Sequence, residues 1–199
     1  LPNWQTFLTA LGIGYADPAL ALANCRTALQ RLAAGDVLGA LATAEGVRAE
    51  ISHPPVASYC VWKLFQLTGD ERLLEEAMPQ LLRWHRWWRE ARDPNDNRIL
   101  GWGSADETGM AAHPLYTEAE RDEKSGVLQL DDAGLSSLWA LDAVALMRMA
   151  LHAGRQELAT LLEEEVQEVA ERMNLMLWDH TQGIYRSLDW DLQPTDCQS

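Results

Sequence analysis

The feature that most constrains the fold is a pairing of two helix types that occurs twice. Residues 56–67 are predicted to form a helix that is apolar on nearly every side, and residues 70–91 to form an amphipathic one. The same order returns at 133–153 and 156–177. A helix with so little polar surface has to be buried almost all round, so each amphipathic helix is expected to cover its apolar partner. Two helical hairpins of this kind predict an all-α layered array, as in an α/α toroid or an α-solenoid.

The N-terminal part of the chain also carries helix signals. Asp17 is followed by a proline, a combination typical of an N-cap and a first helical residue, and Gly35 ends the apolar run 19–34. Asp36 could cap a second, shorter helix that ends near Glu45. This predicts helices in the part of the chain before the first complete hairpin.

Local signals set the ends of the two hairpins. Gly69 is expected to stop the first apolar helix, and Asp70 to cap the helix that follows. Pro79 predicts a kink or short break in that helix, because proline removes a backbone donor. Gly154 ends the second apolar helix.

The whole chain, residues 1–199, is expected to be a single, partial α/α barrel domain. It has a long loop at about 92–131 and a non-helical tail from about residue 179. A connection of this length favours either a functional loop or disorder, and its tryptophan, glycine and proline content favours an ordered one. The chemistry of the chain is therefore expected in this loop.

Composition excludes several kinds of partner. A formal net charge of −14 opposes binding to nucleic acid or to anionic lipid, and we expect neither a membrane span nor a signal peptide. Cys25, Cys60 and Cys197 lack the spacing of a disulfide framework or a zinc site, which favours a reducing cytoplasm. No cofactor and no metal are predicted. An acidic surface is compatible with a sugar ligand.

Several short motifs resemble those of the (α/α)6-barrel glycoside hydrolases, in particular the mannosylglycerate and glucosylglycerate hydrolases, processing α-glucosidases and trehalases. The similarity covers roughly residues 50 to 188. The motifs, in chain order, are His53-Pro54-Pro55-Val56, Tyr59-Cys60-Val61-Trp62-Lys63-Leu64, Leu67-Thr68-Gly69-Asp70, Trp84-His85-Arg86-Trp87-Trp88, Gly101-Trp102-Gly103-Ser104, Leu138-Trp139-Ala140-Leu141-Asp142-Ala143, Leu177-Trp178-Asp179 and Gly183-Ile184-Tyr185.

This resemblance implies inverting hydrolysis of α-linked sugars, in which one carboxylic acid protonates the leaving oxygen and an opposite carboxylate activates water. The family's acid is an Asp in a Gly-hydrophobic-Asp-Asn-x-Pro segment. Here that segment runs from Gly109 to Pro114 and places Ala111 at the acid position. The family's base is a Glu in later hairpins that this chain lacks. The resemblance therefore implies about half of a barrel, without either catalytic group.

Asp106 and Glu107 are the carboxylates nearest to the missing acid. One of them could serve as a surrogate acid if burial raised its pKa toward neutrality. Alternatively, they cap the loop by accepting backbone N–H bonds, or pair with an arginine. Both interpretations follow from the sequence.

Four further residues are candidates for substrate binding. Trp102 and Tyr116 could stack against a sugar ring, or could fasten the long loop through buried aromatic surface. His113 could bond to a hydroxyl or be structural, and His53 lies where relatives present a polar residue to the substrate. Trp84 and Trp88 share one helix face and are expected to pack in the core.

The sequence thus predicts a glycoside hydrolase-like chain that is inactive as it stands, with a small sugar or glycoside as ligand. The alternatives are a non-catalytic carbohydrate-binding module and a helical interaction scaffold. An open half-ring would leave apolar inner-helix surface uncovered, so self-association or a complementary chain is also expected.

Overall fold

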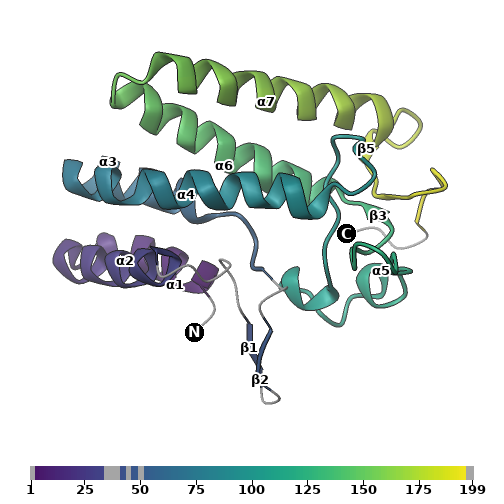
Figure 1. Cartoon of the computed structure of the whole chain (residues 1–199), viewed down its shortest axis with the longest axis horizontal. Coiled ribbons are helices and arrows are strands. Elements are labelled where there is room, and N and C mark those ends of the chain that lie inside the picture. The colour runs from purple at the N-terminus through teal and green to yellow at the C-terminus, as the bar shows by residue number, and fades with distance from the viewer. Residues whose placement is uncertain (1–2, 34–40, 44–45, 49–51, 196–199) are drawn as a thin grey trace.

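The structure, a computed structural model, describes residues 3–33, 41–43, 46–48 and 52–195. These residues form helical hairpins arranged one above the other (Figure 1). The predicted all-α class is confirmed. The hairpins are α1 (Asn3–Gly14) with α2 (Pro18–Ala33), α3 (Ala57–Thr68) with α4 (Glu71–Arg92), and α6 (Ala133–His152) with α7 (Gln156–Met176).

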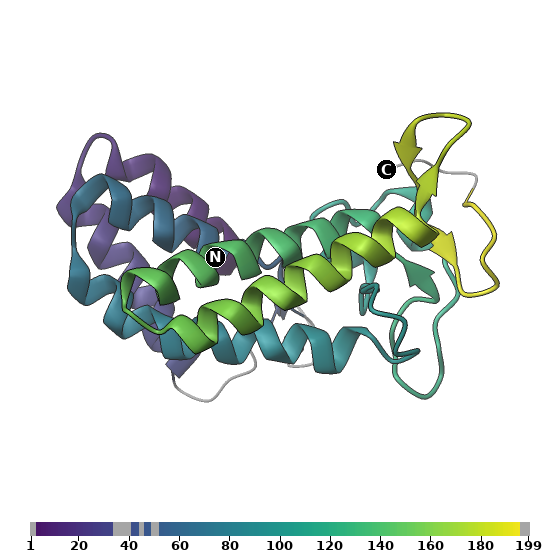
Figure 2. The ribbon, with the colours of Figure 1, turned by 90° about the horizontal axis from the view of Figure 1, so that it is seen from above.

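The hairpins form two layers. Helix α3 packs against both α1 and α6, and these first helices of the hairpins make up the inner layer. Helices α2, α4 and α7 cover it as the outer layer, with α2 and α7 each packed on the first helix of its own hairpin. The short turns of the hairpins lie at one end of the molecule, at the left of Figures 1 and 2, and the long loop and the tail lie at the other end. We call the latter the loop end.

The packing of the inner layer follows from the apolar pattern of α3. Most of its residues are buried, and Leu64 is 1% exposed. Helix α1 approaches closely because it ends in a glycine: a Cβ on Gly14 would lie 2.9 Å from Leu64 Cδ1. The wholly apolar helix is therefore the centre of the layer, as the sequence predicts.

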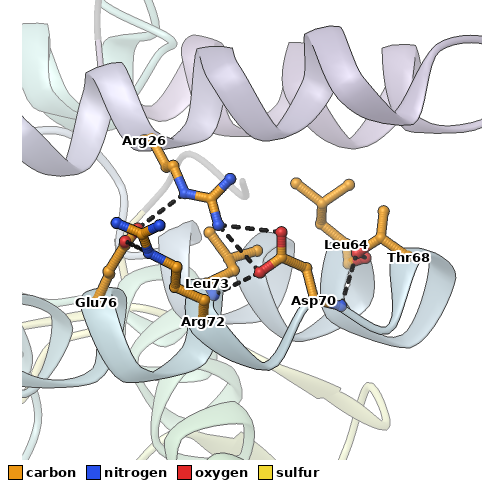
Figure 3. Close-up of polar contacts among 7 residues, drawn as sticks. All are labelled: Arg26, Leu64, Thr68, Asp70, Arg72, Leu73 and Glu76. Carbon is orange, nitrogen blue, oxygen red and sulfur yellow. Dashed lines mark hydrogen bonds and ion pairs between the residues drawn. The ribbon is translucent and has the colours of Figure 1, made fainter.

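An arginine joins the first hairpin to the second (Figure 3). Arg26 of α2 bonds through Nη2 to both carboxylate oxygens of Asp70, at 3.0 Å each, and through Nε to Glu76 at 2.8 Å. Asp70 also caps α4 by accepting the Leu73 N–H at 2.9 Å. The predicted N-cap is confirmed, and the same carboxylate fixes the position of α2.

Two predictions about helices are wrong. Of the kink or short break expected at Pro79, the break does not occur: helix α4 is continuous from Glu71 to Arg92, because buried residues on both sides, Met78 and Leu81 among them, hold it against the core. The short helix expected up to Glu45 is replaced by a two-stranded hairpin of β1 (Leu41–Thr43) and β2 (Gly46–Arg48). The proposed cap, Asp36, and Glu45 itself lie outside the described residues. Helix α1 is an addition to the predicted elements.

The long connection lies between α4 and α6 and is ordered by short elements. It contains the 3-10 helix η1 (Ala105–Glu107), helix α5 (Pro114–Thr117) and strand β3 (Leu130–Asp131). The tail adds β4 (Trp178–Asp179), which pairs with β5 (Ile184–Tyr185), and β6 (Leu188–Asp189), which pairs with β3. The loop and the tail are thus tied together at the loop end.

Candidate functional site at the loop end

A buried ion pair anchors the start of the long loop. Glu107 is fully buried, and Arg92 at the end of α4 bonds to it through Nη2 and, at 3.1 Å, through Nε. Glu107 also accepts backbone N–H bonds from Gly103, at 2.6 Å, and Ser52, at 2.7 Å. The carboxylate therefore connects three segments: the end of α4, the loop, and the approach to α3.

This geometry favours the structural interpretation of Glu107. Both of its oxygens accept bonds from the protein itself, so neither is directed at solvent, where a leaving group would have to lie. The backbone of Gly103 lies close against the guanidinium of Arg92, because a Cβ on Gly103 would lie 2.6 Å from Arg92 Nη2. Asp106, in contrast, is exposed on η1. The structure separates the two neighbouring carboxylates into an anchor and a surface group.

The predicted aromatic residues come together, but in the interior. The ring of Trp102 meets Trp88 edge-on at a centroid distance of 5.8 Å and Tyr116 at 6.5 Å. Trp102 is 2% exposed and Tyr116 3%. Burial raises the pKa of the Tyr116 hydroxyl, as does the neighbouring charge of Asp132. In this arrangement the two rings fasten the loop, the second of the two interpretations given for them.

The two predicted histidines have different positions. His113 is the N-cap of α5, and its Nδ1 accepts the Leu115 N–H at 3.2 Å. His53, just before α3, is 3% exposed, and burial lowers its pKa. His113 thus has a capping role at the edge of the loop, and His53 lies beneath the surface.

The position that the resemblance assigns to the general acid is open to solvent. Ala111 lies in the turn between η1 and α5, and both it and Ala112 are exposed. The turn reaches back toward the first helix, since a Cβ on Gly109 would lie 3.5 Å from the Trp4 ring of α1. The loop therefore places a solvent-exposed methyl group at the position that the resemblance assigns to the acid.

A cavity of about 350 Å³ lies beside this turn, between α5, β3 and β6. That volume is within the range of small-molecule sites. None of the six predicted site residues lines it. Its walls are formed by Pro114, Leu115, Glu118, Ala119, Glu120, Gln129, Leu130, Asp189, Trp190, Asp191 and Thr195.

Sequence reasoning missed Trp190 of this cavity. It is half-buried and stands between two aspartates in the tail that is predicted to be non-helical. The signal that could have identified Trp190 is its place in a polar, non-helical segment, where no helical pattern predicts that a tryptophan is buried.

A second missed group is Asp131, which is 1% exposed and follows Leu130 of the cavity wall in strand β3. Burial raises its pKa to about 6, although amide hydrogen bonds from Asn95 and Asn97 act in the opposite direction. The carboxylates of Asp93 and Asp189 raise it further. Among the described residues, no group of three or more His, Cys, Asp or Glu side chains could hold a metal ion.

Layered helical hairpins with a loop-rich end define the class of fold: an all-α, toroid-type domain. More particularly, the chain belongs to the family described as the mannosylglycerate hydrolase MGH1-like glycoside hydrolase domain, which matches residues 2–198. The resemblance inferred from the short motifs is confirmed.

Curated relatives agree with this assignment. Over 73 residues the chain is 37% identical to mannosylglycerate hydrolases MGH1 and MGH2 of Selaginella moellendorffii. That match covers 35% of this chain and 15% of each relative. The chain thus matches only a small part of the curated relatives.

Solved structures share the fold. A GH63 mannosylglycerate hydrolase from Thermus thermophilus, in complex with Tris and D-glycerate, superposes with a TM-score of 0.79 at 18% identity. An uncharacterized conserved protein from the same organism gives 0.74 at 20% identity. The matches cover 98% and 96% of this chain, but 63% and 59% of those chains. The chain therefore corresponds to a partial barrel, as predicted.

Proposed function

We propose that this chain binds a small α-linked glycoside at its loop end and does not itself cleave the glycosidic bond. The observation that carries the proposal is the alanine at the acid position in a chain of this glycoside hydrolase family. Inverting hydrolysis needs a proton donor on the leaving oxygen, and a methyl group has no proton to give. The carboxylate nearest in sequence that is buried, Glu107, is held by Arg92.

The cavity beside α5 is the proposed binding site. Half-buried Trp190, which lines the cavity, supplies an aromatic ring for the C–H surface of a sugar. The carboxylates around it accept hydrogen bonds from sugar hydroxyls, and the side-chain amide of Gln129 can both donate and accept them. Because solved relatives were obtained with glucose and with D-glycerate, a glycosylglycerate is the first ligand to test.

Two measurements test this proposal. Calorimetric titration with mannosylglycerate and glucosylglycerate is expected to show binding, weakened about tenfold in Trp190→Ala, because loss of an aromatic contact costs about 1.4 kcal/mol. Tyr185→Ala removes an exposed ring outside the cavity and is the matched control. Absence of binding by the unaltered chain would remove the proposed site.

The second measurement is release of free sugar from the same glycosides. Neither the unaltered chain nor Ala111→Asp is expected to release sugar, because the family resemblance places the general base in hairpins outside residues 1–199. Turnover by the unaltered chain above a protein-free blank would contradict the proposal. Turnover by Ala111→Asp alone would show that the chain does contain a base.

A helical interaction scaffold is the second candidate. It is favoured by the burial of Trp102, Tyr116 and His53, three of the four residues first expected to meet a sugar. The scaffold interpretation predicts that no glycoside binds and that a protein partner does. The titration with glycosides described above therefore separates the two candidates.

A further inference from the structure

The cavity at the loop end carries charge of one sign only. Helix α5 and strand β3 lie beside each other there (Figure 1), and the tail with β6 completes the walls. Among the described residues that form the walls, none is a lysine, an arginine or a histidine. Four wall residues carry carboxylates, the exposed Glu118, Glu120 and Asp191 and the half-buried Asp189. A ligand in the cavity therefore meets negative charge.

These four carboxylates are not neutralised by the protein. Within the part of the chain that the structure describes, none of them takes part in an ion pair. Asp189 uses one oxygen, Oδ1, to accept the Gln193 N–H at 2.8 Å. The charges are therefore available to a ligand.

The basic side chains on the neighbouring segments are directed elsewhere. Arg121 and Lys124 are exposed on the turn after α5 and lie outside the walls, and Arg121 donates to a backbone carbonyl of that turn at 3.0 Å. Arg186 contacts the wall residue Thr195 through the backbone carbonyl, at 3.1 Å, and its Nη1 faces Asp179 at 3.4 Å. The guanidinium of Arg186 thus has its own carboxylate and does not offset those of the cavity.

The negative potential of this wall acts on a neighbouring group. Asp131 lies on β3, which pairs with β6 so that Leu130 is opposite Asp189. The pKa of Asp131 is raised to about 6, first by burial and also by the carboxylates of Asp93 and Asp189. Asp189 therefore influences groups across the β3–β6 ladder.

An aromatic ring beside unpaired carboxylates is suited to an ammonium group. Trp190 stands between Asp189 and Asp191 and lines the same cavity. A cation near an aromatic ring is attracted by its quadrupole, and hydrogen bonds from an ammonium group to carboxylates are stronger than those from neutral hydroxyls. A ligand carboxylate in the same place would be repelled by the walls.

We propose that the cavity selects its ligand by charge: it prefers a glycoside that carries an amine to a neutral one, and it leaves an anionic group such as glycerate outside in solvent. The inference rests on the proposed function, since it assigns the chemical class of the ligand to the same cavity. A glycosylglycerate then binds through its sugar ring, and its carboxylate contributes no favourable contact.

Calorimetric titration with three glucosides tests the proposal. The probes are methyl α-glucoside, which is neutral, the derivative in which an amine replaces the primary hydroxyl, and glucosylglycerate, which is anionic. At neutral pH the amine is protonated. It is expected to bind about tenfold more tightly than the neutral glucoside, and glucosylglycerate more weakly than either. Added salt should reduce both differences, because it screens charges near the surface.

The possible outcomes separate this inference from the proposed function. If none of the three glucosides binds, the proposed function fails and the charge selectivity with it. If all three bind equally, or if glucosylglycerate binds more tightly than the neutral glucoside, the sugar site stands and the charge selectivity is overturned.

A double variant, Glu118→Gln with Asp191→Asn, locates the selectivity in the cavity. It is expected to lose most of the preference for the amine and to keep its affinity for the neutral glucoside, which also shows that the variant is folded. Glu157→Gln with Glu163→Gln is the matched control, because it removes the same charge from exposed positions on α7. An unchanged preference in the cavity variant, or an equal loss in the control, would contradict the proposal.

Discussion

At the scale of single residues, the Arg92–Glu107 pair determines how the loop end is built. Arg92 ends α4 and Glu107 lies in the middle of the loop, so their contact folds the loop back onto the helix from which it emerges. The guanidinium also lies over the Trp87 ring, 4.8 Å from its centroid. The pair therefore joins the loop both to the helix and to the aromatic core.

We predict that Arg92→Ala is severely destabilising. Removing one partner of a buried pair leaves an uncompensated charge, which costs about 3–5 kcal/mol. Arg72→Ala is the control, because Arg72 is 79% exposed in its pair with Glu76 and should lose less than about 1 kcal/mol. Urea unfolding measures both, and equal losses would show that Glu107 does not depend on Arg92.

The role of Glu107 was not accessible from its sequence position. Arg92 is fifteen residues away from it and Ser52 fifty-five, so the partners that occupy the carboxylate are brought there only by the fold. Local sequence did show that this segment is dense in polar and aromatic groups. It could not show which of them face inward, and the same applies to Trp102 and Tyr116.

At the scale of elements, one histidine joins three helices. His85 of α4 is 1% exposed and bonds through Nδ1 to Asp142 of α6 at 3.0 Å and through Nε2 to Glu165 of α7 at 3.2 Å. Its ring stacks on Trp139 with centroids 4.4 Å apart. Burial alone would lower the pKa of His85, but the hydrogen bonds and charges of the two carboxylates outweigh it and raise the pKa.

We predict that this junction makes stability depend on pH. Because the folded-state pKa of His85 lies above its ordinary value of 6.5, its contribution is complete below pH 6.5 and is lost as pH rises through the folded-state pKa. Each unit of elevation corresponds to about 1.4 kcal/mol. Urea unfolding at pH values from below 6.5 upward should show the free energy of unfolding of the unaltered chain falling toward that of His85→Gln. A constant difference would mean that His85 is not charged at the junction.

The cap of α4 gives a second prediction for the elements. Asp70→Ala removes both the N-cap bond to Leu73 and the two contacts with Arg26 (Figure 3). We expect a loss of about 2 kcal/mol, above the roughly 1 kcal/mol of a cap alone. Asp17→Ala is the matched cap variant, since the Asp17 side chain accepts the Leu20 N–H on α2. A double variant with Arg26→Ala should cost less than the sum of the two single variants, because both of them lose the Arg26–Asp70 contacts, whereas full additivity would contradict the coupling.

The elements also show where local signals succeed. Caps and stop signals such as Asp70 and Gly69 correctly gave the boundary between α3 and α4, because capping is a local interaction. Pro79 failed as a signal because tertiary burial outweighs the loss of one hydrogen bond. Helix α1 was missed because one of its faces stays partly exposed and its apolar residues form only a weakly amphipathic pattern.

At the scale of the whole molecule, the alternation of apolar and amphipathic helices was sufficient to predict a layered α/α array. The periodicity of each helix identifies its layer, and three hairpins follow this rule within the described residues. The cavity could not be predicted, since it forms where the long loop meets the tail, between residues around 114–130 and 189–195. Its walls are adjacent only after the hairpins have packed.

The most direct test of the account is hydrogen–deuterium exchange with and without mannosylglycerate. The account predicts that the glycoside slows exchange at the loop end, in the segments 114–130 and 189–195 that form the cavity, and leaves α7 unchanged. Protection confined to the helices, or none at a ligand concentration that saturates binding, would contradict a sugar site at the loop end.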